Sequence, residues 1–132
     1  KTMWHTFTSA TAFNQPLEAW EVGQVTDMGA MFGSATAFNQ PLEAWDVGQV
    51  TYMYDMFHSA TAFNQPLEAW DVGQVTRMQS MFSGANALSD CHKLATHTSF
   101  ESQVPSAWPY DWSAVACLRP PSLPPSSPPS LP

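Results

Sequence analysis

A tandem repeat is the feature of this 132-residue sequence that most restricts its fold. Residues 34–51, SATAFNQPLEAWDVGQVT, recur letter for letter at 59–76, and also at 9–26 with Glu21 in place of Asp. A repeat of this length indicates a stacked array, because one unit cannot bury its own apolar face. We therefore predict that residues one period apart lie in neighbouring coils, and that a single copy does not fold.

Large apolar residues recur in columns at a step of 25 residues. Met in such columns fills irregular gaps in a core, and stacked rings bury large areas. The expected core columns are Phe13, Phe38 and Phe63; Trp20, Trp45 and Trp70; Met28, Met53 and Met78; and Phe32, Phe57 and Phe82.

The spacing of apolar residues changes within each repeat. Leu42, Trp45 and Val47 end in the alternation that is typical of a strand. From Val50 to Phe57 the apolar spacing is helical. We therefore predict a repeat solenoid with one short parallel β-strand and one helical or 3₁₀ segment per coil.

The pattern M-x-x-M-F-x-x-A-x-x-F-N-Q-x-L-x-x-W-D-V-x-x-V-T, over residues 3 to about 90, resembles the BspA-like class of leucine-rich repeats. The segment LSDCHKLATHTSFESQ and the later SAWPYDW resemble the closing region that follows such repeats in large surface proteins. The resemblance implies a leucine-rich-repeat-like solenoid, an extracellular or cell-surface location and a role in adhesion. It implies no catalytic residues.

Three regions are expected. Residues 1–90 form the solenoid, three full coils preceded by the remnant of another at 1–12, and residues 91–118 form a capping segment. Residues 119–132, RPPSLPPSSPPSLP, form a proline-rich disordered tail or linker. The chain begins at Lys1 within a repeat, so we expect a fragment or processed product that self-associates or frays at its truncated N-terminal coil.

Two cysteines, Cys91 and Cys117, bracket the capping segment. A metal site that includes His92 and His97 is one interpretation, but the spacing fits no zinc motif. We expect a disulfide, which also indicates an oxidising compartment.

The charge of the chain excludes some partners. Its formal net charge is −7, and its four basic residues are scattered. Nucleic acids and anionic membranes require clustered Lys and Arg, so neither is expected to bind. No apolar run reaches the roughly 18 to 20 residues that a membrane helix needs.

Acidic residues form two outward-facing columns on the predicted strands: Glu18, Glu43 and Glu68, and Glu21, Asp46 and Asp71. Carboxylates stacked about 4.8 Å apart repel one another. One interpretation is a solvated face that keeps the array soluble. The other is calcium bound between successive coils, and no other cofactor is expected.

Three further groups have alternative interpretations. Tyr52, Tyr54 and His58 occupy positions that differ between repeats, so they are candidates for an aromatic binding patch or products of drift on a tolerant surface. The column Asn14, Asn39 and Asn64 is expected to bond the backbone of adjacent coils. Trp108, Tyr110 and Trp112 are expected to cover the last coil, with a carbohydrate-stacking platform as the alternative.

The sequence thus predicts a non-enzymatic, extracellular or cell-surface repeat module for adhesion, with a protein or a polymeric glycan as partner. The alternative is a structural stalk or fibre segment of a surface or cell-wall protein. No Ser-His-Asp order, metal ligand set or phosphate loop suggests an enzyme.

Overall fold

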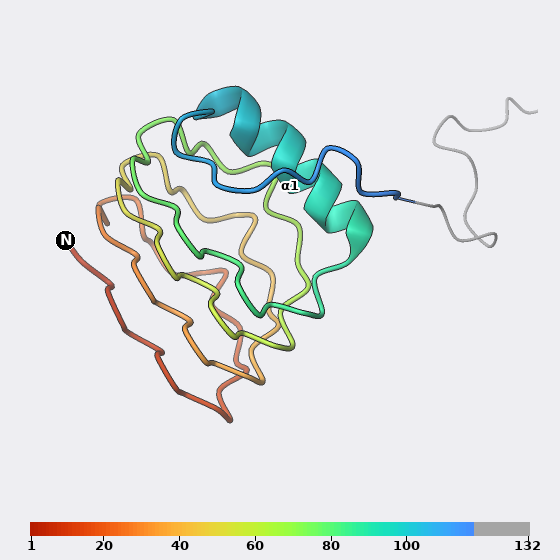
Figure 1. Cartoon of the computed structure of the whole chain (residues 1–132). Helices are drawn as coiled ribbons and strands as arrows, with labels where there is room; N and C mark the ends of the chain where they lie inside the picture. The colour runs from red at the N-terminus through yellow and green to blue at the C-terminus, as the bar shows by residue number, and fades with distance from the viewer. Residues whose placement is uncertain (118–132) are drawn as a thin grey trace, which may run out of the picture.

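The computed structural model describes residues 1–117, in which the repeats lie side by side and a single helix covers one end (Figure 1). Parallel bridges join Thr2 to Asp27, Asp27 to Tyr52, and Tyr52 to Arg77. Each bridge joins equivalent positions of successive repeats. The helix, α1, spans Asp90–Gln103. The predicted tail at 119–132 lies outside the described residues.

The predicted fold class is wrong. Within residues 1–117 the structure has isolated bridges, one helix and no sheet, so it is not a leucine-rich-repeat solenoid with a strand in each coil. In the segment predicted as a strand, the backbone N–H of Trp45 turns back to the carbonyl oxygen of Leu42, 3.0 Å away. The backbone N–H groups that bond within these local turns are the ones that a parallel β-ladder would need, so no ladder forms here.

The predicted helical segment of each repeat is a run of turns. Alternate N–H groups bond within the repeat and across to the next one: Met31 N–H donates to the carbonyl of Met28 at 3.2 Å, whereas Phe32 N–H donates to that of Met56 at 2.9 Å. Ala30 has a φ of 53°. A helix requires negative φ at every position and sends its donors four residues back. Bonding between repeats therefore replaces a helix here.

Stacked phenylalanines form the centre of the core. The centre of the Phe32 ring lies 5.5 Å from the ring centres of Phe7 and Phe57, and the three rings are nearly parallel. It lies 4.2 Å from the ring centre of Phe38. Most side chains of the predicted core columns are less than 6% exposed: Phe38, Phe63, Trp45, Trp70, Met28, Met53, Met78, Phe32, Phe57 and Phe82.

The repeat farthest from α1 departs from the expected burial. Trp20 is 42% exposed and Phe13 is only half-buried, whereas Trp45 and Trp70 are buried. Each of those two indoles is covered by the preceding repeat, to whose backbone it bonds. No described residue takes that place over Trp20.

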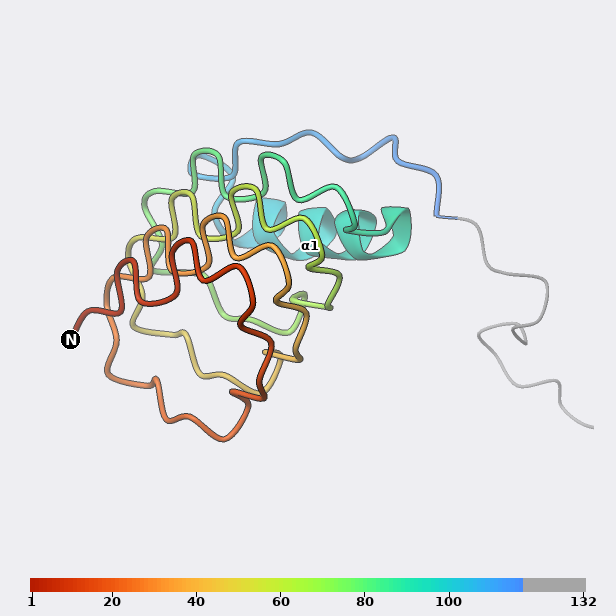
Figure 2. The same cartoon turned by 90° about the horizontal axis from the view of Figure 1, so that it is seen from below.

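The helix end of the stack is closed by α1 and the segment that follows it (Figures 1 and 2). The Ser89 side chain caps α1 by accepting from the N–H of His92. Gln103 donates to the carbonyl of Trp70 and accepts from the N–H of Val72. These side-chain bonds tie α1 to the last repeat.

Candidate binding surface

Two of the positions that differ between repeats form neighbouring rows on one side of the stack. The first row is the bridged set Thr2, Asp27, Tyr52 and Arg77, and the second is Trp4, Gly29, Tyr54 and Gln79. A buried Met separates the rows in the repeats, as Met53 does between Tyr52 and Tyr54. We call these two rows the variable face.

Aromatic side chains gather at the centre of the variable face. The rings of Tyr52 and Tyr54 lie 6.4 Å apart, and the guanidinium of Arg77 lies 5.5 Å from the centre of the Tyr52 ring. Tyr52 is 38% exposed and Trp4 is 52% exposed. The face therefore presents rings and a cation to solvent.

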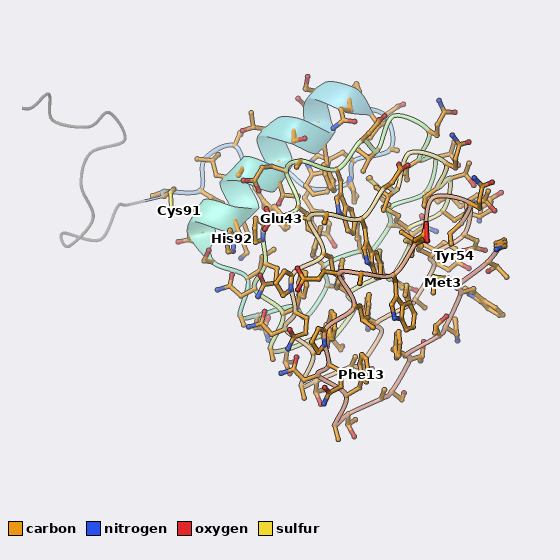
Figure 3. All side chains as sticks on the ribbon, turned by 180° about the vertical axis from the view of Figure 1, so that it is seen from behind. Met3, Phe13, Glu43, Tyr54, Cys91 and His92 are labelled. Carbon is orange, nitrogen blue, oxygen red and sulfur yellow. A yellow bond between two sulfur atoms is a disulfide. The ribbon has the colours of Figure 1, made fainter. Side chains whose placement is uncertain are left out.

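A glycine sets the position of Tyr54. A Cβ at Gly29 would lie 2.5 Å from Cζ of Tyr54, so the phenol ring packs directly over the backbone of the preceding repeat. In Figure 3, Tyr54 and Met3 lie on the side of the stack opposite His92. Sequence reasoning singled out Tyr54 but not Gly29, because the role of Gly29 depends on its contact with Tyr54 in the next repeat.

His58 lies apart from the tyrosine pair. It is exposed, and its Nδ1 lies 3.2 Å from the hydroxyl of Ser59. In the described part of the chain, its ring contacts neither Tyr52 nor Tyr54. The structure therefore brings together two of the three residues proposed for a patch.

The asparagine column bonds one repeat to the next. Oδ1 of Asn14 accepts from the N–H of Asn39 at 2.8 Å, and Oδ1 of Asn39 accepts from that of Asn64 at 2.9 Å. At the cap, Oδ1 of Asn64 accepts from Ser89 N–H and lies 2.7 Å from Nδ1 of His92. His92 thus ends this ladder.

The acidic columns are exposed along their length: Glu18, Glu43, Glu68, Glu21, Asp46 and Asp71. Oδ1 of Asp46 accepts from Gly48 N–H, and Oδ1 of Asp71 accepts from Gly73 N–H, both at 3.0 Å. Among residues 1–117, no three His, Cys, Asp or Glu side chains group closely enough to hold a metal ion. The geometry offers no calcium site in these columns.

The aromatic residues after α1 pack against the last repeat. Phe82 contacts the rings of Trp108, Tyr110 and Trp112, and its N–H donates to the Tyr110 hydroxyl at 3.0 Å. In the preceding repeat the equivalent N–H, that of Phe57, donates to a backbone carbonyl. The phenol oxygen therefore stands in for the carbonyl of a further repeat.

Sequence reasoning missed the role of His97. Its Nδ1 accepts a 2.9 Å hydrogen bond from the indole N–H of Trp108, which fixes the position of that ring. Ser113 bonds to Oδ1 of Asp111, and these bonds, with a smaller effect of nearby His97, lower the pKa of Asp111. No repeat column marks these residues, and Trp108, Asp111 and Ser113 lie outside α1, so no pattern in the sequence signalled these contacts.

The predicted disulfide between Cys91 and Cys117 is confirmed. It ties the start of α1 to the end of the described chain. Within residues 1–117, α1 is neither long nor apolar enough to cross a membrane.

One comparison with known proteins gives a match. A family model described as "Mycoplasma protein of unknown function, DUF285" matches residues 1–104. Neither a curated protein nor a solved structure matches the chain.

Proposed function

The chain belongs to the DUF285 family, described from Mycoplasma, and we propose that it is a non-enzymatic binding module of a cell surface, with a role in adhesion. The repeat pattern supports a closer relationship to the BspA-like surface proteins. The Cys91–Cys117 disulfide supports an extracellular location, because such bonds persist in oxidising compartments.

The tyrosine pair of the variable face, in which Tyr52 is exposed and Tyr54 is half-buried, is the observation that carries this proposal. Two of the repeats are identical over 18 consecutive residues and the third differs from them there only at Glu21, and the other differing positions include the outward residues beside the core methionines. Tyr52 and Tyr54 combine large apolar rings with hydroxyl groups, a combination that is enriched where proteins bind partners. We infer that the identical residues maintain the stack and that the variable face contacts a protein or a polymeric glycan.

The test is a binding screen of the immobilised 132-residue chain against cell-wall glycans and matrix proteins. We expect saturable binding that the double substitution Tyr52→Ala and Tyr54→Ala abolishes. Glu43→Ala is the matched control, because Glu43 is exposed outside the variable face. Binding that survives the tyrosine double substitution would exclude the variable face as the site.

A structural stalk is the second candidate, and the exposed tryptophans at the end away from α1 favour the self-association that a stalk requires. Trp4 is 52% exposed and Trp20 is 42% exposed. Such a surface favours self-association. Because α1 covers the other end, pairing through the Trp20 end closes at a dimer, whereas a fibre needs two open ends.

Light scattering and electron microscopy distinguish these outcomes. Dimers that Trp20→Ser separates would support self-association without a fibre. Long fibres in the absence of any ligand would support the stalk and contradict closure by α1. A monomer at all concentrations would remove the Trp20 end as an interface.

A further inference from the structure

A groove lies on the cap, between the second half of α1 and the segment at 105–113. It has a volume of about 360 Å³, and its lining includes His97, Glu101, Trp108, Tyr110 and Asp111. The sequence interpretation treated this region as a cover for the last repeat. The cover therefore has a concave outer surface with its own chemistry.

Two carboxylates give the groove its charge. Glu101 and Asp111 are both exposed at its lining. The hydrogen-bond donors to Asp111 are the N–H and hydroxyl of Ser113, which are neutral. These bonds lower the pKa of Asp111, so its carboxylate is ionised at neutral pH. A net charge of −7 on the whole chain further attracts cations and repels anions.

His97 lines the groove with its ring held by Trp108. Its Nδ1 accepts from the indole N–H of Trp108, which is a donor only. The Nδ1 side of the imidazole is therefore already partnered within the cap.

The geometry disfavours the sugar platform as well as a metal. Trp108 is 6% exposed, and the Tyr110 ring stacks on Trp112 with the ring centres 4.7 Å apart. Little open ring face remains for a pyranose. The described residues also hold no group of three metal ligands. An organic cation fits better, because it can pair with the carboxylates and does not need a broad aromatic platform.

The same aromatic cluster already receives an ammonium group from within the chain. Nζ of Lys93 lies 5.7 Å from the centre of the Trp112 ring, which stacks on Tyr110. We propose that the groove between Glu101 and Asp111 binds a lysine or arginine side chain of a protein partner. This site is separate from the variable face, so either proposal can fail alone.

The test is a titration of the ¹⁵N-labelled full chain with N-acetyl-lysine amide and N-acetyl-arginine amide. The readout is the NMR signal of the Trp108 indole N–H, which lies in the groove and bonds to His97. N-acetyl-glutamine amide and neutral chitotriose serve as uncharged probes. We expect saturable shifts with the two cationic probes alone.

Substitutions of the two carboxylates test whether they bind the cationic probes. Glu101→Gln and Asp111→Asn should each weaken binding about two- to fivefold, the effect of one partly exposed ion pair. The matched control Glu43→Gln removes the same charge from the repeats and should leave binding unchanged. Equal weakening by all three variants would indicate attraction by net charge alone and overturn the proposal. Saturation by chitotriose but not by the cationic probes would replace it with a sugar site.

Discussion

The indole N–H of Trp70 donates to the carbonyl oxygen of Leu42, 2.9 Å away and 28 residues earlier in the chain. Trp45 makes the same bond to Leu17 at 2.8 Å. Both bonds are buried, so each tryptophan fills the core and also satisfies a carbonyl of the preceding repeat. In this segment a side chain provides the connection that a β-ladder would provide elsewhere.

Trp70→Phe should destabilise the chain by about 1 to 3 kcal/mol, because it removes the buried indole bond to the Leu42 carbonyl, which then keeps only the backbone N–H of Trp45 as a donor. The matched control is Trp20→Phe, at a position where the indole is 42% exposed. That change should alter the free energy of unfolding by less than about 0.5 kcal/mol. Urea unfolding followed by circular dichroism measures both, and equal effects would contradict a special role for the buried bond.

Asn39→Ala tests the asparagine ladder. Oδ1 of Asn39 accepts from the N–H of Asn64 and from Nε2 of Gln65, each at 2.9 Å. Loss of both bonds should cost about 1 to 2 kcal/mol of unfolding free energy. Asn86→Ala, at an exposed position, should stay within about 0.5 kcal/mol of the parent. A similar loss in the two variants would show that the ladder adds no stability.

Gly29→Ala should move the Tyr54 ring with little effect on the fold. The new methyl group would lie 2.5 Å from Cζ of Tyr54, but the far end of that side chain can swing away. We expect altered Tyr54 ring shifts in NMR spectra and the same loss of partner binding as in Tyr54→Ala. Gly23→Ala is the control, since its methyl group meets only Asp46, at an ordinary distance of 3.5 Å. Unchanged Tyr54 signals in Gly29→Ala would contradict this packing.

The pH dependence of stability should include a contribution from Asp111. Its pKa is lowered in the folded chain, first by the hydrogen bond from the Ser113 side chain. A carboxyl group with a lowered folded pKa contributes stability above its unfolded pKa and loses it as the pH falls through the folded value. Below pH 3.8, the ordinary pKa of an aspartate, the urea midpoint of the parent should therefore fall more steeply with decreasing pH than that of Asp111→Asn. Asp90→Asn serves as the comparison, and an identical slope in the parent and Asp111→Asn would oppose this assignment.

Reduction of the Cys91–Cys117 disulfide should destabilise the cap. The bond joins residues 26 positions apart, and a loop of that length contributes about 3 to 4 kcal/mol. We expect a lower unfolding midpoint in dithiothreitol and weaker hydrogen-exchange protection of α1. The double substitution Cys91→Ser and Cys117→Ser should show the lower midpoint without any response to dithiothreitol. A reductant-insensitive parent would show that the cap holds without the bond.

Parts of the candidate surface could be predicted from residues alone. Tyr52 and Tyr54 stand out because they occupy positions at which otherwise nearly identical repeats differ, and the structure places their rings together. His58 stands out for the same reason, yet it lies apart from the two tyrosines. A difference between repeats shows that a position is free to vary, but it does not show which other residues lie near it. Gly29 and His97 give no such signal. Their roles come from Tyr54 and Trp108, which are neighbours only after folding.

The sequence by itself determined the period of the chain and the residue types of each column. An exact repeat gives every copy the same local preferences, and bridges between Asp27, Tyr52 and Arg77 follow that 25-residue step. Only the tertiary structure decided how the backbone runs within each repeat. Apolar spacing reports which side chains turn inward, but strands, helices and tight turns can all satisfy it. The choice depends on where each N–H finds its acceptor, and here half of those in the Met-rich turns find it in the neighbouring repeat.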